Sequence, residues 1–127
     1  MHRPTILVAD DDKCVRAGLR RHLTCLGYQV VEAEDGLAVL RECPKGQIDV
    51  ILLDQGMPNG DGRSIARMIR KESDVPIIFL SGHGREDFRE IVATLSDMYL
   101  LPKPANDAKL THLLAALHVA PPVGAQV

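Results

Sequence analysis

Carboxylates follow two short apolar runs of this sequence, and carboxylates in such positions can hold a metal ion or accept a transferred group. Asp10 and Asp11 come directly after the apolar run Thr5 to Ala9. Asp54 follows a second, nearly unbroken apolar run, Ile48 to Leu53. A carboxylate cluster without His or Cys suits a hard divalent cation such as Mg2+. An aspartate can also act as the nucleophile that takes a phosphoryl group.

Two further polar side chains follow apolar runs later in the chain. Ser81 comes after Val75 to Leu80, and Lys103 comes shortly after Met98 to Leu101. A lysine supplies a positive point charge and a serine supplies a hydroxyl donor, and both suit phosphoryl oxygens. If the carboxylates also gather there, a like-charge pair about 4 Å apart costs on the order of 4 kcal/mol at an effective dielectric near 20. A cation or protons must therefore neutralise such a cluster.

The hydrophobic pattern predicts the elements that bring these residues together. Apolar or β-rich runs predict strands over residues 5–9, 28–33, 48–53, 75–80 and 98–101. Helical spacing between and after them predicts five helices, near residues 13–26, 37–43, 61–71, 88–95 and 110–117. Alternating strands and helices form a parallel sheet covered on both faces. In such a sheet the carboxyl ends of all strands lie at one edge, which is where ligands bind.

The same spacing predicts which helix faces are buried. Asp12 is expected to cap the first helix and Gly27 to end it. The expected inward residues of the first and third helices are Val15, Leu19, Leu23, Leu26, Ile65, Met68 and Ile69. The expected solvent-facing residues of these helices are Arg16, Arg20, Arg21, Arg63, Arg67, Arg70 and Lys71. The stripe formed by Phe88, Ile91, Val92 and Leu95 is expected in the core.

Length and composition are those of one globular domain. The chain has 127 residues and a net charge of -2, which provides no general attraction to nucleic acid or anionic membrane. No apolar run is long enough to cross a bilayer, and the first residues do not form a signal peptide. The cysteines suit reduced thiols in a cytoplasmic protein, with Cys25 and Cys43 at or near helix packing faces. We expect a domain over residues 1–119 and a flexible tail over residues 120–127.

Four segments occur together in a specific order and spacing: ILVADDD, DVILLDQGMPNGDG, PIIFLSG and LPKP. In these segments the chain resembles the CheY-like receiver domain of response regulators in two-component signal transduction. The resemblance covers about residues 5–118, which is nearly the whole chain. It implies a flavodoxin-like (βα)5 fold, a doubly wound parallel sheet with strand order 2-1-3-4-5.

The resemblance also implies a metal site and an acceptor residue. Asp54 would be the phosphoacceptor and one ligand of Mg2+. Asp11 would bind Mg2+ directly, and Asp10 would bind it mainly through water. The backbone carbonyl of Gly56, two residues after the acceptor, would be a further ligand.

Other residues would bind the phosphoryl group and report its presence. Ser81 would bond a phosphoryl oxygen and move when the site is loaded, and Lys103 would pair with the phosphoryl group, with a cis bond before Pro104. The family usually has an aromatic residue three positions before the lysine, which changes rotamer with the serine. Here that position holds Leu100, and the tyrosine is next to it at Tyr99. Either another side chain carries this coupling or the final strand contains a local shift.

The implied function is that of a phosphorylatable receiver rather than an enzyme with a separate substrate. It would accept a phosphoryl group from a phosphohistidine on a sensor histidine kinase or a histidine phosphotransfer protein. Phosphorylation would switch binding of a downstream target through the fourth helix, fifth strand and last helix, and a homodimer is a further option. Two alternatives remain. Leu100 favours an interaction module that signals without phosphate. A small-molecule phosphatase or phosphotransferase is disfavoured, because Gly56 stands where such enzymes tend to have a second acid.

Overall fold

The computed structural model describes residues 3–43, 48–54, 56–57, 62–81, 96–102, 107–117 and 119. Its strands are β1 (Thr5–Ala9), β2 (Gln29–Ala33), β3 (Val50–Asp54), β4 (Ile77–Ser81) and β5 (Met98–Pro102). Its helices are α1 (Lys13–Cys25), α2 (Gly36–Glu42), α3 (Gly62–Arg70) and α5 (Asp107–Ala116). The helix expected over residues 88–95 lies outside the described residues. None of the described helices is long and apolar enough to span a membrane.

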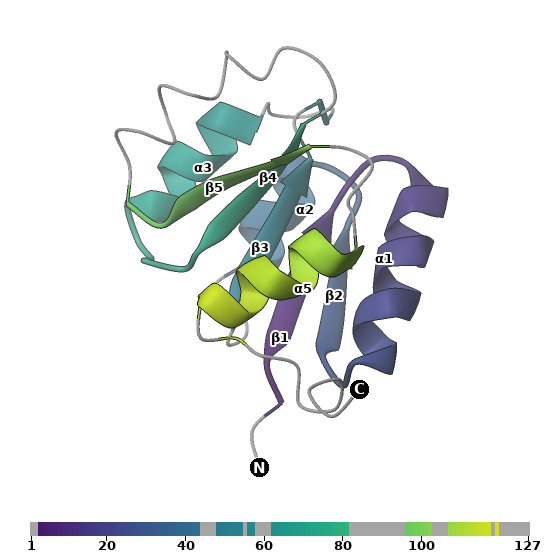
Figure 1. Ribbon diagram of the computed structural model, residues 1–127. Coiled ribbons are helices and arrows are strands. Elements are labelled where there is room, and N and C mark those ends of the chain that lie inside the picture. The colour runs from purple at the N-terminus through teal and green to yellow at the C-terminus, as the bar shows by residue number, and fades with distance from the viewer. Residues whose placement is uncertain are drawn as a thin grey trace.

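The five strands form one parallel sheet in the order β2-β1-β3-β4-β5. This is the strand order that the sequence resemblance implied. All strand arrows point to the same edge of the sheet in Figure 1. The residues that end the strands therefore gather at that edge, which we call the carboxyl edge.

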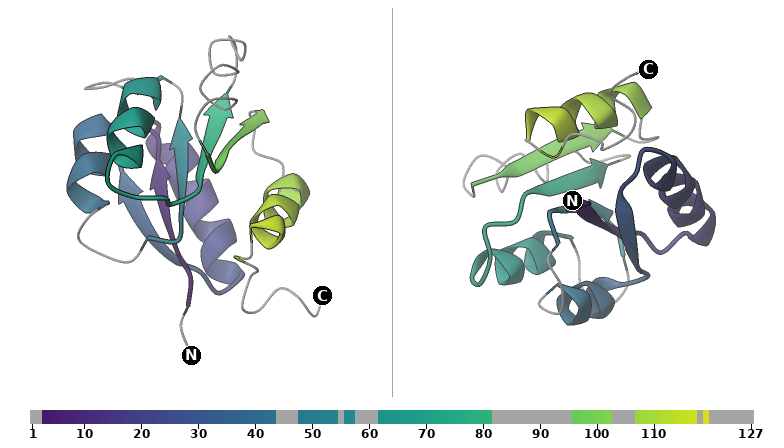
Figure 2. Two further views of the ribbon diagram at one scale, coloured as in Figure 1. Left: turned by 90° about the vertical axis from the view of Figure 1, so that its left-hand side faces the viewer. Right: turned by 90° about the horizontal axis from the view of Figure 1, so that it is seen from below.

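Helices cover both faces of the sheet. Figure 2 shows α1 and α5 on one face and α2 and α3 on the other. Side chains alternate between these faces along each strand, as the pleat requires. In β1, Ile6 and Val8 pack with residues of α1 and α5, whereas Leu7 and Ala9 pack with residues of α2 and α3. β3 is buried throughout, because it lies in the middle of the sheet and is covered on both sides.

The ends of α1 are formed by the residues that the sequence predicted. The Asp12 carboxylate accepts hydrogen bonds from the backbone N–H groups of Cys14 and Val15, at 2.8 and 3.2 Å. These bonds satisfy donors that have no partner within the helix. Gly27 has a φ of 99°, a conformation that glycine adopts without strain. The cap places Asp10 and Asp11 immediately before the first turn of α1.

Several expected helix faces were wrong. Val15 is exposed, because α1 packs through Leu19 and Leu23, one and two turns further on. Met68 is exposed, since it lies about 100° around α3 from the buried Ile69. Cys25, at the last position of α1, is also exposed.

Cys43 and Arg70 do contribute to packing. Cys43 packs against the core beside α2 and α3, as expected, and none of the three cysteines forms a disulfide. Arg70 was expected in water, but its guanidinium donates to the carbonyl oxygens of Ser73 and Val75, both at 2.8 Å, and of Asp97 at 3.3 Å. Arg70 therefore connects the end of α3 to the segments that precede β4 and β5.

Candidate functional site

Three carboxylates meet at the carboxyl edge of the sheet. One oxygen from each of Asp10, Asp11 and Asp54 lies within 4.8 Å of the other two. Asp10 is fully buried and Asp54 is 5% exposed, whereas Asp11 is exposed to solvent. The sequence prediction that these three side chains lie together is confirmed. The arrangement is a cluster of negative charge that solvent reaches at Asp11.

The junction between β1 and α1 is held by backbone hydrogen bonds around Asp10. The N–H of Asp10 donates to the carbonyl of Ala33 on β2 at 3.1 Å. The Asp10 carboxylate accepts from the N–H of Asp12 at 2.8 Å. Nη1 of Arg16, one turn into α1, donates to the Asp10 carbonyl at 2.7 Å. Asp10 is thus fixed through its N–H, its carbonyl and its side chain.

Asp54 and Ser81 are the last residues of neighbouring strands. The sequence placed them just after strands ending at residues 53 and 80, but the ladder continues by one residue in each strand. Asp54 is paired with Leu80, and Ser81 is paired with Pro102. Ser81 is fully buried. The structure therefore places the Ser81 hydroxyl on the strand next to Asp54, one residue beyond the register position of the carboxylate.

The segment after β3 is anchored on one side. Met57 is buried in the core beside α2 and α3. Gly56 is exposed, and a side chain built at this position would meet nothing within 4 Å. The Cα of Gly56 therefore faces open space. The metal-binding role of that carbonyl stays a prediction.

β5 pairs with β4 in a regular register over its whole described length. Tyr99 pairs with Ile78 and Leu100 pairs with Phe79 in an unbroken ladder. Leu100 packs against the core beside α2 and α3, while Tyr99 packs on the opposite face beside α1 and α5. The described part of β5 therefore contains no bulge. The roles of Leu100 and Tyr99 in switching stay predictions.

The Tyr99 hydroxyl forms a hydrogen bond within its own segment. It donates to a carboxylate oxygen of Asp97 at 3.3 Å. Burial, followed by the nearby Asp97 charge, raises the pKa of the Tyr99 hydroxyl. Asp97 has a φ of 53°, in the left-handed region that non-glycine residues seldom adopt. The turn before β5 is thus tied both to Tyr99 and, through its carbonyl, to Arg70.

Some predicted site residues lie outside the part of the chain that the structure describes. These are Lys103 and Pro104. Their placement, and the cis bond before Pro104, stay predictions.

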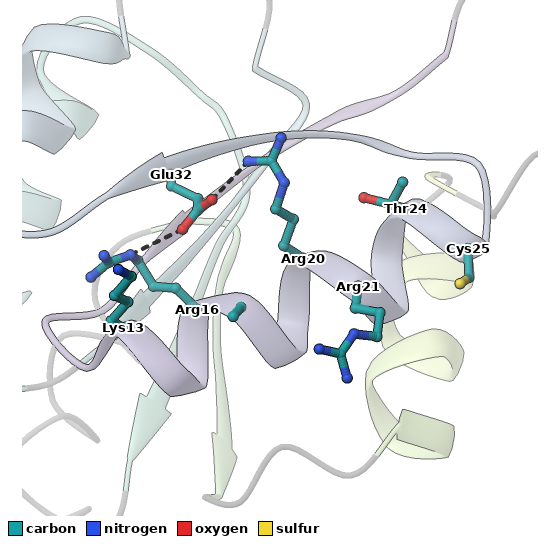
Figure 3. A pocket seen from close by; sticks show the side chains of 8 residues that line it. Lys13, Arg16, Arg20, Arg21, Thr24, Cys25 and Glu32 are labelled. Carbon is teal, nitrogen blue, oxygen red and sulfur yellow. Dashed lines mark hydrogen bonds and ion pairs between the residues drawn. The ribbon is translucent and has the colours of Figure 1, made fainter.

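Arg16 is a site residue that the helical pattern missed, because the arginines of α1 were all expected in water. Its side chain is only 12% exposed. Nε of Arg16 donates to one oxygen of Glu32 on β2 at 3.1 Å, and Nη1 of Arg20 pairs with the other at 2.7 Å. Figure 3 shows both arginines reaching from α1 to Glu32. Hydrogen bonding, first to Arg20, lowers the pKa of Glu32. A signal was available in the sequence, since Arg16 follows the capping Asp12 by one helical turn.

Comparison with known proteins identifies the family. Residues 6–115, most of the chain, match the response regulator receiver domain. The chain belongs to the response regulator receiver domain family. Among relatives, this receiver domain is 42% identical over 103 residues to the response regulator MprA of Mycobacterium sp. (strain KMS), covering 78% of this chain and 44% of that protein. The chain spans less than half the length of the relatives that it matches in this way.

Solved structures agree with the fold of this receiver domain. It is similar to the chemotaxis response regulator CheY4 of Vibrio cholerae, with a TM-score of 0.82, 26% identity, and coverage of 91% of this chain and 99% of that one. It is also similar to the receiver domain of the sensor histidine kinase PA1611 of Pseudomonas aeruginosa PAO1. There the TM-score is 0.80 and the identity 30%, with 91% and 98% covered. The PA1611 structure has a magnesium ion coordinated in its active site cleft.

The acidic cluster of this receiver domain fits a magnesium ion on its own chemistry. Its three carboxylates supply the hard oxygen ligands that Mg2+ prefers. Among the described residues, no His or Cys side chain belongs to the cluster. The spacing of the three carboxylates lets one cation be held directly or through a bound water. The carboxylates also repel one another, so a divalent cation removes an unfavourable interaction as well as forming new ones.

Proposed function

We propose that this receiver domain accepts a phosphoryl group on Asp54 from a phosphohistidine of a sensor histidine kinase or a histidine phosphotransfer protein. The observation that carries the proposal is the placement of Asp54. It is nearly buried, yet its carboxylate lies within 4.8 Å of two others at the carboxyl edge. Such a carboxylate is held in a fixed position for attack and is flanked by groups that suit a divalent cation.

The chain's own residues would perform distinct parts of the transfer. An oxygen of Asp54 attacks phosphorus, and the bond between phosphorus and the donor histidine nitrogen breaks. Asp10, Asp11 and the Gly56 carbonyl would hold Mg2+ with Asp54. Bound Mg2+ would supply positive charge to the transferring phosphoryl oxygens.

Two residues would complete the binding of the phosphoryl group. The buried Ser81 hydroxyl, at the end of the strand beside Asp54, would donate to a phosphoryl oxygen. Lys103 would pair with another. Donors that are fixed before the reaction stabilise developing charge without having to reorganise.

The output would arise where β5 and α5 meet solvent, together with the segment expected to form the fourth helix. A phosphoryl group adds negative charge and three acceptor oxygens, and such a change can bias a two-state element. Ser81 is paired with Pro102 on β5, so a movement of Ser81 reaches β5 directly. Leu100, in place of the usual aromatic residue, would carry this movement by packing rather than by a hydroxyl group.

The extent and setting of the domain are also proposed. A domain over residues 1–119 is supported by Val119, which is buried and whose carbonyl accepts a hydrogen bond from the Tyr28 hydroxyl. The tail expected over residues 120–127 lies outside the described residues. We place the domain in the cytoplasm as a signalling module. Its downstream target could be another protein or a second copy of this chain, with no direct contact to nucleic acid or membrane.

The deciding experiment is the intact mass of the protein after incubation with acetyl phosphate and Mg2+. The matched samples are wild type, Asp54→Asn and wild type with EDTA. We expect one phosphoryl adduct in wild type only. Some receivers reject small donors, so beryllofluoride with Mg2+ provides a second readout by nuclear magnetic resonance (NMR). No adduct and no spectral change would reject the proposal and favour a phosphate-independent interaction module.

A further inference from the structure

Arg16 connects the outer edge of the sheet to the acidic cluster. Its guanidinium bonds Glu32 on the edge strand β2 with Nε and the Asp10 carbonyl with Nη1, at 3.1 and 2.7 Å. Both contacts are partly buried, and the Arg16 side chain is 12% exposed. Arg20, by contrast, is 54% exposed and pairs with Glu32. The two arginines therefore share a partner, while the Asp10 contact belongs to Arg16.

The Asp10 carbonyl matters because it belongs to the peptide that joins Asp10 to Asp11, and the side chains of both residues contribute to the acidic cluster. Asp10 is fully buried, and a buried carbonyl that loses its donor is unfavourable. Without Arg16, the peptide that joins Asp10 to Asp11 would turn toward another donor. That turn would move the Asp11 carboxylate relative to Asp54.

Glu32 helps to fix the position of the Arg16 side chain. It is paired with Val8 in the ladder between β1 and β2, two residues before Asp10. Its carboxylate accepts from both arginines, so Nε of Arg16 is held by Glu32 while Nη1 donates to the Asp10 carbonyl. Figure 3 shows Arg16 and Glu32 lying across the gap between α1 and β2. A planar guanidinium can make both contacts at once, whereas an ammonium group is a single point of charge.

We propose that Arg16 is a positioning residue of the metal site, which sets Mg2+ affinity by holding the Asp10 carbonyl. The inference rests on the proposed function, since it assumes that the acidic cluster binds Mg2+. A positioning role and a purely electrostatic role of Arg16 predict opposite changes in Mg2+ affinity when the arginine is removed. A nearby positive charge disfavours a cation, so loss of that charge alone would tighten Mg2+ binding. Loss of the bond that positions the Asp10 carbonyl would instead weaken Mg2+ binding.

The test compares Arg16→Met with Arg20→Met by a Mg2+ titration followed by NMR. Both variants remove one arginine charge from Glu32, but only the first removes the donor to Asp10. We expect Arg16→Met to raise the Mg2+ dissociation constant about tenfold, as is typical for groups that orient metal ligands. Arg20→Met should stay within about twofold of wild type. The melting temperature of each variant in EDTA is measured in parallel, because a merely structural role would change that temperature and leave the Mg2+ dissociation constant unchanged.

Each outcome decides the inference. A weaker Mg2+ affinity in Arg16→Met alone supports it. Equal changes in the two variants, tighter binding in Arg16→Met, or no change overturn it while leaving the proposed function intact. A wild-type protein that does not bind Mg2+ overturns both. If Arg16→Met does not fold, Arg16→Lys replaces it, with the same weakening expected because an ammonium group paired with Glu32 leaves the Asp10 carbonyl without its donor.

Discussion

Replacing Asp54 with asparagine should stabilise the metal-free protein. Asp10 and Asp54 are both at least 95% buried, and one carboxylate oxygen of Asp10 lies within 4.8 Å of one of Asp54. A like-charge pair at that distance repels by about 1 kcal/mol at the dielectric constant of water and about 3.5 kcal/mol at an effective dielectric of 20. The exposed Asp11 adds a smaller contribution. Asparagine keeps the shape of the side chain, but only one of its two terminal atoms can accept a hydrogen bond.

We therefore expect Asp54→Asn to raise the free energy of unfolding by about 2 kcal/mol in EDTA, or the melting temperature by about 8 °C for a domain of this size. The assay is urea and thermal unfolding followed by circular dichroism, with Asp74→Asn as a control because Asp74 is exposed. Mg2+ should stabilise wild type much more than Asp54→Asn, since a ligand stabilises only the state that binds it. A variant that is less stable than wild type in EDTA would refute the reasoning.

Three further perturbations test contacts that the structure shows. Glu32 has a lowered pKa when folded, so its contribution to stability is present above its ordinary value of 4.5 and is lost as the pH falls through the lower, folded value. Glu32→Gln should therefore reduce the loss of unfolding free energy at acid pH, measured by urea unfolding. An unchanged pH dependence would contradict the pairing of Glu32 with the arginines. Burial raises the pKa of Tyr28 to about 12, so its contribution is present below 10.0 and is lost as the pH rises toward 12. Tyr28→Phe should flatten this alkaline loss and cost about 1 kcal/mol at neutral pH, because the Val119 carbonyl loses its donor. Arg70→Met should cost about 2 kcal/mol in urea unfolding, since Arg70 donates to three carbonyls, whereas the exposed Arg67→Met should stay within about 0.5 kcal/mol. Equal effects of the two arginine variants would argue against the Arg70 contacts.

The sequence by itself determined the described strands, their direction and the edge at which the carboxylates meet. A continuous apolar run predicts a buried strand, and parallel strands have their carboxyl ends at one edge. The sequence alone therefore predicts that Asp10, Asp11 and Asp54 lie together. The strand order came from the resemblance to a family, because periodicity alone does not say which strands are neighbours.

Only the tertiary structure decided which polar side chains are buried and which apolar ones are exposed. Arg16 and Arg70 looked like solvent-facing arginines, yet each reaches carbonyls that belong to other segments. Val15 lies on the apolar stripe of α1, but the core on that face reaches only from Leu19 onward. Tyr99 packs on the face of α1 and α5 and Leu100 on the opposite face, a choice that the period of the strand alone leaves open. One physical reason applies to all of these residues. The period of a helix or strand is set by the residues nearby in the sequence, whereas the burial of a side chain depends on which neighbouring element covers it and how far that element extends.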